Sequence, residues 1–282
     1  MLLDFTDHSA PYITGNGFAV RCGRYFAWGN LGINPTRDLG INPTRDNDVI
    51  YCKTDDVGAL FVAPPWDPFV LVTHNSDLAI GEECRRYLDD SRVKFWLAQN
   101  PAIDHPKLRA LPIGIANREW PHGDVRAIQR HVPLGGPYFA ERKREVVFAS
   151  YFSENDTDGE RARCAQILSR ERVLTTLPKT PFPDYLDDLS RAWFCASPRG
   201  RGIDAHRTWE ALLVGTIPIV TRSLVARDHE DFPIAVLDRW DDFCAADFTP
   251  ERARRMWDGF DRSLLFMDGY LKRLETRYGV SF

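Results

Sequence analysis

Residues 194–220 read FCASPRGRGIDAHRTWEALLVGTIPIV, and this stretch changes its hydrophobic pattern twice. The apolar run Trp193–Ser197 predicts a strand, Ala205–Val214 has the pattern of a helix, and Ile217–Val220 predicts a second strand. A strand, a helix and another strand in succession form a crossover that places the two strands parallel in one sheet. The stretch therefore predicts an open α/β sheet.

The same alternation extends to both sides of this stretch. In the second half of the chain we expect further strands at Val146–Ser150, Val173–Leu177 and Ile234–Asp238, with helices at Gly159–Ser169 and Tyr185–Ala192. In the first half we expect a helix at Gly81–Asp90 and strands at Val49–Cys52, Phe69–Thr73, Val93–Leu97 and Leu108–Pro112. The segment Pro133–Arg144 contains glycine, proline and a run of charges, which is typical of a linker. We therefore predict two α/β domains, residues 1–138 and 139–282.

The end of the chain has a separate pattern. From Ala253 to Tyr278, apolar residues recur at steps of three and four, so one face of a helix would be apolar along its whole length. Thr249 followed by Pro250 is typical of a helix start, and Gly279 is typical of a helix end. These signals predict one long amphipathic C-terminal helix.

The composition is that of a globular protein. The 282 residues include 36 basic and 40 acidic side chains, giving a net charge of −4, and 44% of residues are hydrophobic. A slightly acidic chain is a poor candidate for a dedicated nucleic-acid binder. Only six of the 36 basic residues are lysines, so 30 are arginines. A GC-rich genome explains this excess, and so does recognition of phosphate or carboxylate, which the planar guanidinium group binds well.

Cysteine usage and the N-terminal sequence indicate the compartment. The six cysteines are widely spaced, without the CxxC pairs of zinc ribbons or redox dithiols, so we expect reduced thiols and no metal. The first residues, MLLDFTDHSAPY, lack the basic and apolar regions of a signal peptide, and no apolar run approaches the roughly 20 residues that cross a bilayer. We expect a cytoplasmic protein without a membrane span.

One segment of the first half is duplicated. Leu31–Asp38 reads LGINPTRD and is repeated without change as Leu39–Asp46. Two copies of eight residues are too short for a solenoid, and the Asn-Pro content favours an extended surface loop. The duplication is either a slippage event without function or a mobile loop that covers an acceptor.

The loop of the opening stretch carries the strongest chemical signal. Gly200 and Gly202 lie between the strand and the helix, and Asp204 can cap that helix, so backbone N–H groups and the positive end of a helix dipole meet at one sheet edge. Four basic side chains occupy the same loop and first turn: Arg199, Arg201, His206 and Arg207. Arg207 and Glu210 lie one turn apart, either as an ordinary ion pair or as ligands of a diphosphate and a ribose. The pattern favours an anionic ligand.

At this point the sequence resembles a known family. The segment PRGRG followed by HRTWEALLVGTIPIV is similar to the signature of exostosin-like glycosyltransferases, and looser similarity extends to Val146–Cys164, Phe69–Asp77 and Leu111–Asp124. The resemblance implies a GT-B fold, in which two Rossmann-like α/β domains face a central cleft and a C-terminal helix closes the structure. The N-terminal domain would then bind the acceptor and the C-terminal domain a nucleotide-sugar.

The resemblance also implies an activity and a donor site. The activity is inverting, metal-independent transfer of a hexose or pentose from a nucleotide-sugar, with a UDP-sugar expected, to a hydroxyl group of a saccharide. Arg207 matches the family's phosphate-binding arginine and Glu210 its ribose-binding glutamate. The expected donor-binding residues are Ser150, Arg161, Arg199, Gly200, Arg201, His206, Arg207 and Glu210.

Inverting transfer needs a base that deprotonates the acceptor hydroxyl group. Ligands of open sheets bind beyond the carboxyl ends of the strands. The predicted strand Phe69–Thr73 leads into His74 and Asp77, so we expect Asp77 as the base, with His74 as second choice; Asp77 could instead cap the turn that follows. Trp120 and His122 follow another strand and are the expected acceptor-binding residues, although Trp120 could also simply pack.

Two alternatives remain open at this stage, a DNA acceptor and binding without catalysis, and a metal-dependent class is disfavoured. Asp-x-Asp pairs, which hold a metal in another glycosyltransferase class, occur at Asp46/Asp48 and Asp156/Asp158, but 28 aspartates would give about three such pairs by chance. Transfer to hydroxylated bases in DNA would need a basic groove. A nucleotide-sugar-binding module without catalysis would keep Arg207 and Glu210. The GxGxxG pattern of dinucleotide enzymes is absent, which disfavours NAD.

Overall fold

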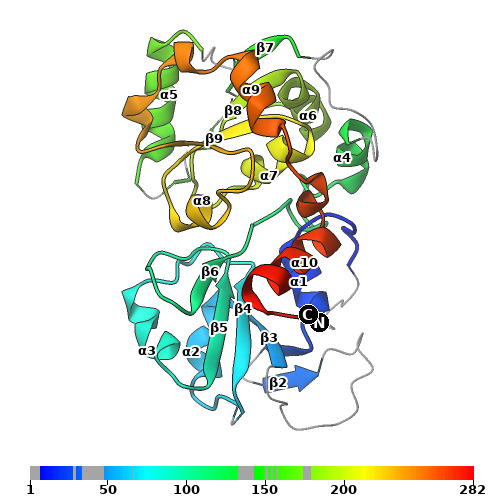
Figure 1. Ribbon diagram of the computed structural model, residues 1–282, viewed down its shortest axis with the longest axis vertical. Helices are drawn as coiled ribbons and strands as arrows, with labels where there is room; N and C mark the ends of the chain where they lie inside the picture. The colour runs from blue at the N-terminus through cyan, green and yellow to red at the C-terminus, as the bar shows by residue number, and fades with distance from the viewer. Residues whose placement is uncertain are drawn as a thin grey trace. The chain divides into compact units, whose positions relative to one another are not determined.

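The computed structural model describes residues 7–27, 30–33, 48–65, 67–132, 143–149, 152–153, 155–156, 158–173 and 179–282. The chain divides into two compact units (Figure 1). Unit 1 consists of Met1–Ile113 together with Arg262–Phe282, and unit 2 of Gly114–Asp261. This division differs from the expected domains 1–138 and 139–282, because the chain enters unit 2 earlier and its last segment returns to unit 1.

Unit 1 is built on a six-stranded sheet in the order β2-β1-β3-β4-β5-β6. Its strands are β1 (Arg24–Ala27), β2 (Asn30–Ile33), β3 (Asp48–Lys53), β4 (Phe69–His74), β5 (Val93–Ala98) and β6 (Leu108–Ala110). Only β2 is antiparallel to its neighbour, while β1, β3, β4, β5 and β6 are parallel. Every residue of β4 is buried, as expected for a central strand covered on both faces.

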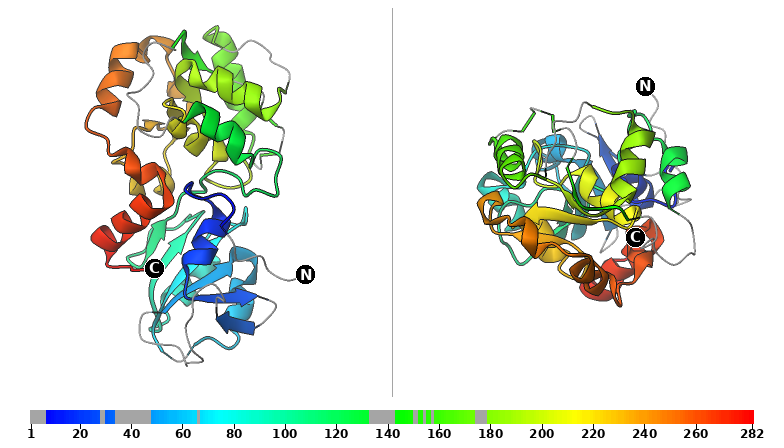
Figure 2. Two further views of the ribbon diagram at one scale, coloured as in Figure 1. Left: turned by 90° about the vertical axis from the view of Figure 1, so that its right-hand side faces the viewer. Right: turned by 90° about the horizontal axis from the view of Figure 1, so that it is seen from above.

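Helices cover both faces of this sheet (Figure 1). They are α1 (Gly15–Arg21), α2 (Val57–Leu60), α3 (Arg85–Leu88) and α10 (Met267–Tyr278), with short 3-10 helices at Thr54–Asp56, Glu82–Cys84 and Arg262–Leu265. Leu60 and Leu88 pack with Trp96 in the main core. The α1 and α10 helices lie side by side, where the ring centroids of Phe18 and Tyr270 are 6.1 Å apart (Figure 2).

Unit 2 contains a four-stranded parallel sheet in the order β10-β9-β8-β7. Its strands are β7 (Glu145–Phe148), β8 (Ala192–Ala196), β9 (Ile217–Thr221) and β10 (Ala235–Leu237). Its helices are α4 (Val125–His131), α5 (Glu160–Arg170), α6 (Phe182–Ser190), α7 (His206–Leu213), α8 (Leu224–Asp228) and α9 (Pro250–Trp257), with 3-10 helices at Trp240–Asp242 and Ala245–Asp247. Phe194 and Ile217 face a core shared with α5 and α9, and Cys195 on the opposite face of β8 faces α7.

The expected α/β alternation is confirmed. Except for Val173–Leu177, each expected strand is present within two residues of its predicted bounds. The helices α5 and α7 lie within one residue of the expected bounds, and α6 begins three residues before the expected start. The two parallel sheets are compatible with two Rossmann-like domains. Within the described strands, apart from the β1–β2 hairpin, both sheets follow the order of the sequence, so a reversal of strand order is not seen there and the GT-B class stays a prediction. Residues 174–178, 133–142 and 34–47, which cover most of the remaining predicted strand, the linker and the duplicated loop, lie outside the described residues.

The prediction of one long C-terminal helix is wrong. The helix α9 ends at Trp257, Gly259 has φ +74°, and α10 begins only at Met267. The apolar stripe is real but serves two cores, because α9 belongs to unit 2 and α10 to unit 1. The two helix boundaries are confirmed: the Thr249 hydroxyl group accepts a hydrogen bond from the N–H of Arg252 at 3.2 Å, and Gly279 adopts φ +68°.

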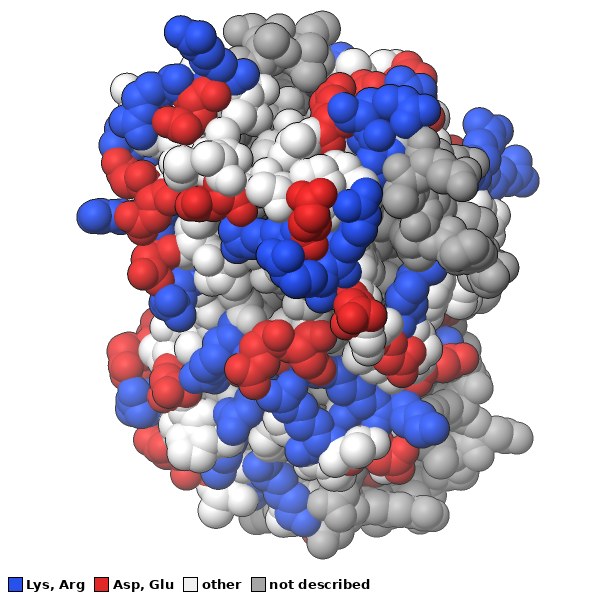
Figure 3. Space-filling view, turned by 45° about the horizontal axis from the view of Figure 1, so that its top comes forward, with Lys and Arg blue, Asp and Glu red and all other residues white. Residues whose placement is uncertain are grey.

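The distribution of charges on the surface and the burial of the cysteines are those of an ordinary globular protein. Basic and acidic side chains are interspersed on the face shown in Figure 3. Five of the six cysteines are buried, Cys244 is exposed, and none forms a disulfide. Within the described part of the chain, no helix has the length and apolarity that a membrane span requires, and no three His, Cys, Asp or Glu side chains are grouped closely enough to hold a metal ion.

Candidate active site

The helix α7 starts beyond the carboxyl end of β8 with an open N-terminus. Its N-cap residue is Ala205, which offers no side chain to the first-turn N–H groups. Asp204 was the expected cap, and this prediction is wrong: one carboxylate oxygen accepts from the N–H of Ala205 at 2.8 Å and the other from Nε1 of Trp209 at 2.7 Å. Asp204 therefore braces the loop next to the positive end of the helix dipole, an end that favours anions.

A small pocket lies beside this N-terminus, where β8 and β9 end and α7 and α8 begin. Apolar residues line it together with hydroxyl-bearing side chains, two arginines and one aspartate: Ser197, Thr208, Thr221, Ser223, Arg199, Arg222 and Asp204. The hydroxyl groups of Ser197 and Thr208 are 2.9 Å apart and hydrogen-bonded. Hydroxyl groups, guanidinium groups and helix N–H groups are the donors that bind phosphate oxygens in proteins.

Arg207 and Glu210 lie on another side of α7 and are arranged around Tyr185. The guanidinium group of Arg207 lies 4.8 Å from the ring centroid of Phe152 and 5.9 Å from that of Tyr185. The Tyr185 hydroxyl group donates to Oε2 of Glu210 at 3.1 Å. Aromatic rings thus hold the arginine, while Tyr185 orients the carboxyl group.

Glu210 is an unusual acid, because it is only 5% exposed. Burial raises its pKa to about 7, although Arg207 and the Tyr185 hydroxyl group oppose the rise. Its second oxygen, Oε1, has no hydrogen-bond donor among the described residues. A buried acid with a raised pKa beside a half-buried cation is typical of a functional site.

Arg161 holds the loop before α7 in place through hydrogen bonds to backbone carbonyl oxygens. This side chain donates from Nε to the carbonyl oxygen of Arg199 at 3.1 Å and from Nη1 to that of Ser153 at 3.1 Å, and it also contacts the side chains of Ser153 and Asn155. A Cβ atom on Gly200 would lie 2.7 Å from Nη2 of Arg161, so a larger residue here would displace the end of that side chain. Arg161 and Gly200, expected as donor-binding residues, therefore shape the loop.

The other expected donor residues differ in their surroundings. Arg199 forms an ion pair with Asp158 at 2.8 Å, and its Nε is buried without a hydrogen-bond partner. Arg201 is exposed, and Nδ1 of His206 donates to the carbonyl oxygen of Gly114 at 2.7 Å. Ser150 lies outside the described residues.

Glu160, at the start of α5, was not expected from the sequence. Its Oε1 accepts hydrogen bonds from the N–H of Arg199 (3.2 Å), the hydroxyl group of Thr221 (3.1 Å) and Nε1 of Trp240 (2.9 Å). It thereby ties the Arg199 loop to the end of β9. A glutamate in the first turn of a helix is a common sequence feature, and nothing in the pattern pointed to donors 39 to 80 residues away.

Trp120 and His122 lie in unit 2, beside the first residue of α7. The ring centroids of His122 and His206 are 5.7 Å apart, and those of His122 and Phe182 are 6.5 Å apart. Trp120 is 57% exposed, with its ring centroid 6.3 Å from that of His122. The expected acceptor-binding residues thus belong to the same unit as the expected donor site.

His74 and Asp77, the expected catalytic residues, belong to unit 1. His74 is buried; its Nε2 donates to the carbonyl oxygen of Pro112 at 3.0 Å, and its Nδ1 accepts from the N–H of Asn75 at 2.8 Å. Burial lowers the pKa of His74 to about 4, so the ring is neutral with both nitrogens engaged. Asp77 is exposed in the bend after β4. Of the two, only Asp77 presents its functional group to solvent.

A polar network next to His74 stiffens the carboxyl edge of the unit 1 sheet. Asn75, at φ +57°, donates from Nδ2 to the hydroxyl group of Tyr51 at 2.8 Å and to Oδ1 of Asn16 at 3.0 Å. The N–H of Asn75 also donates to Oε1 of Gln99 at 3.0 Å. A Cβ atom on Gly15 would lie 1.9 Å from Oδ1 of Asn75. The TGNG segment at the start of α1 therefore requires glycine for this contact.

Replacing Gly15 by alanine should destabilise the protein by about 2 kcal/mol or more, because the added methyl group overlaps Asn75 and the network must move. Gly58→Ala in α2 is the matched control, since its Cβ atom would lie 3.7 Å from the Tyr87 hydroxyl oxygen, an ordinary contact. The control should be neutral or slightly stabilising, because alanine favours a helix. Urea unfolding of both variants measures the difference, and equal stabilities would contradict the assigned role of Gly15.

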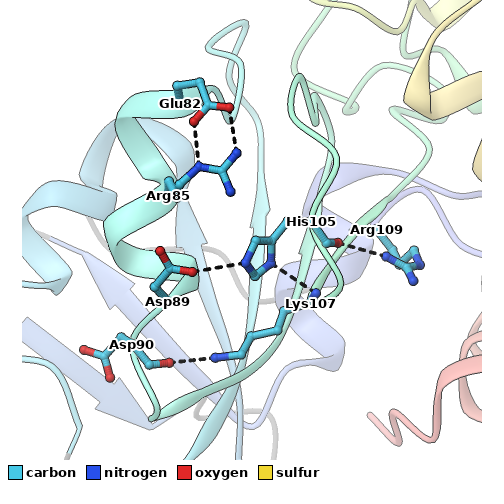
Figure 4. Close-up of polar contacts among 7 residues, drawn as sticks. All are labelled: Glu82, Arg85, Asp89, Asp90, His105, Lys107 and Arg109. Carbon is cyan, nitrogen blue, oxygen red and sulfur yellow. Dashed lines mark hydrogen bonds and ion pairs between the residues drawn. The ribbon is translucent and has the colours of Figure 1, made fainter.

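The opposite edge of the unit 1 sheet carries a different polar cluster (Figure 4). Nε2 of His105 lies 3.3 Å from Oδ1 of Asp89, and Nζ of Lys107 donates to the carbonyl oxygen of Asp90 at 2.9 Å. These contacts link the segment after α3 to the segment before β6, at the amino ends of β5 and β6. Ligands of parallel sheets bind at the carboxyl ends, so we assign this cluster to loop bracing.

Comparisons with known proteins do not assign the chain to a family. The chain matches no model of a known protein family, and no curated protein is similar to it. The functional interpretation therefore rests on the residues around α7 and on the motif resemblance.

Proposed function

We propose that the protein is an inverting glycosyltransferase of the GT-B class that transfers a sugar from a nucleotide-sugar, a UDP-sugar in first place, to a hydroxyl group of a saccharide. The observation that carries the proposal is the buried carboxyl group of Glu210 with the half-buried side chains of Arg207 and Tyr185 at the N-terminal end of α7. Structural side chains rarely combine a half-buried cation with a buried acid of raised pKa at the ligand-binding edge of a parallel sheet.

In this reaction the acceptor oxygen bonds to the anomeric carbon of the sugar, the bond from that carbon to the diphosphate breaks, and the diphosphate leaves with the electron pair. Arg207 and the N–H groups of α7 supply positive charge where negative charge develops, so the leaving group can be stabilised without a metal. Glu210 accepts hydrogen bonds from the ribose hydroxyl groups through Oε1. Ser197 and Thr208 share one hydrogen bond, which leaves one O–H of the pair to donate to a phosphate oxygen.

The proposal predicts that a nucleotide-sugar stabilises the protein against heat. A ligand present at 100 times its dissociation constant adds about 2.7 kcal/mol to the free energy of unfolding. Thermal denaturation with panels of UDP-, GDP- and CDP-sugars should therefore show a raised melting temperature for one nucleotide class. Slow release of free nucleotide from the stabilising donor would separate an enzyme from a binding module. If no member of the panels stabilises the protein, the proposal is wrong.

A further inference from the structure

The loop 117–123 of unit 2 is formed by tight turns with backbone hydrogen bonds. The N–H of Trp120 donates to the carbonyl oxygen of Asn117 at 3.0 Å, and the N–H of Gly123 donates to that of Trp120 at 2.8 Å. A Cβ atom on Gly123 would lie 2.1 Å from the carbonyl oxygen of Asn117, so these tight turns require glycine. Asp124 then caps α4 through the N–H of Arg126 at 2.9 Å. The backbone therefore holds His122 in a fixed place.

His122 differs from four other histidines in the hydrogen bonding of its ring nitrogens. At least one ring nitrogen of His74, His105, His206 and His229 is hydrogen-bonded to the protein. The ring nitrogens of His122 have no such partner among the described residues, and the side chain is exposed, so a substrate can reach a nitrogen lone pair. A residue that accepts a proton from a bound hydroxyl group needs this freedom.

The surroundings of His122 keep it ready to accept a proton. Its ring packs near those of His206, Phe182 and Trp120. Partial burial is the main cause that lowers the pKa of His122, and the positive charge of Lys179 lowers it further. The ring is therefore predominantly neutral at pH 7. Lys179 and His206 are the titratable side chains that these contacts place around it within the described residues.

We propose that His122 is the general base of the transfer reaction and that the exposed ring of Trp120 is the platform on which the acceptor sugar lies. This inference rests on the proposed function. His122 lies against the first residue of α7, hence beside the site proposed for the diphosphate, and aromatic faces pack against the C–H faces of sugar rings. The acceptor hydroxyl proton passes to a ring nitrogen of His122 as the new bond to the anomeric carbon forms and the diphosphate departs.

The test uses the full-length protein and the UDP-, GDP- or CDP-sugar that raises its melting temperature most, with water as acceptor and release of free nucleotide as the signal. We expect His122→Gln to lower the hydrolysis rate at least about 100-fold and to leave the donor-induced melting shift unchanged. Added imidazole should partly restore hydrolysis in His122→Ala, which a structural role would not produce. The wild-type hydrolysis rate should fall at acid pH as His122 is protonated. The rate of His122→Gln should not show this fall.

Two variants serve as comparisons. His131→Gln, at the end of α4 in the same unit, should hydrolyse the donor at the wild-type rate. Asp77→Asn tests the base expected from the sequence. A wild-type rate in His122→Gln, a loss in Asp77→Asn alone, or a wild type that binds the donor without hydrolysing it would each overturn the assignment of His122. If no donor raises the melting temperature, the proposed function itself fails.

Discussion

Arg207→Ala should lower the affinity for the nucleotide-sugar about 30-fold or more, because removal of one charged partner from a desolvated site costs roughly 2–5 kcal/mol. The rings of Phe152 and Tyr185 hold the guanidinium group in place before any ligand arrives, so little conformational entropy is lost on binding. Isothermal titration with the stabilising donor measures the loss. The affinity of Arg207→Lys should lie between those of the wild type and Arg207→Ala, since lysine keeps the charge but lacks the planar guanidinium fork.

The variant should still fold, and the reason lies in Glu210. Arg207 lowers the pKa of this acid at present, so without the arginine the carboxyl group stays protonated at pH 7 and keeps its contact with Tyr185. Arg163→Ala in α5 is the control, because its ion pair with Asp241 is exposed to solvent and contributes little to stability. Unchanged donor affinity in Arg207→Ala would contradict the phosphate site, provided that circular dichroism shows a folded protein.

Local patterns predicted most of the fold, and long-range contacts explain the exception. Strands and helices such as Trp193–Ser197 and Ala205–Val214 are defined by neighbouring residues, whose periodicity is visible in the sequence. The periodicity of the C-terminal segment was visible too, but it could not show that Gly259 interrupts the helix. Residues in phase on two helices produce the same pattern as one long helix, and only the cores they enter distinguish them.

The candidate site was predictable to the extent that it lies in one continuous segment. Arg207 and Glu210 were found because their spacing places them on one helical face. Tyr185 and Glu160 were missed, because the side chains that hold the site come from α5 and α6 and meet α7 only in the fold. The sequence likewise showed Gly200 but not that the guanidinium group of Arg161 lies against it.

Glu210→Gln should change how stability depends on pH. A pKa raised from 4.5 to about 7 corresponds to roughly 3 kcal/mol, since each tenfold change in proton affinity is worth about 1.4 kcal/mol. Below pH 4.5 the Glu210 carboxyl group is protonated in both the folded and the unfolded state, so its contribution to the free energy of unfolding is fully present. Between pH 4.5 and 7 the unfolded chain ionises first, so wild-type stability falls relative to Glu210→Gln and then levels off above pH 7. Urea unfolding at pH 5, 6, 7 and 8 measures this difference.

Glu251→Gln is the control, because Glu251 is an exposed glutamate at the start of α9, and its curve should parallel that of the wild type. Parallel curves for Glu210→Gln as well would contradict the burial of that acid. A fold that keeps a carboxyl group at such a cost to stability at neutral pH retains it for a function that glutamine cannot supply. Ribose hydroxyl groups that donate to Oε1 stabilise the ionised form, so donor binding near pH 7 should release a proton from Glu210. The binding enthalpy should then vary with the ionisation enthalpy of the buffer in the wild type and not in Glu210→Gln, and a wild type without this variation would exclude Glu210 from the ribose contact.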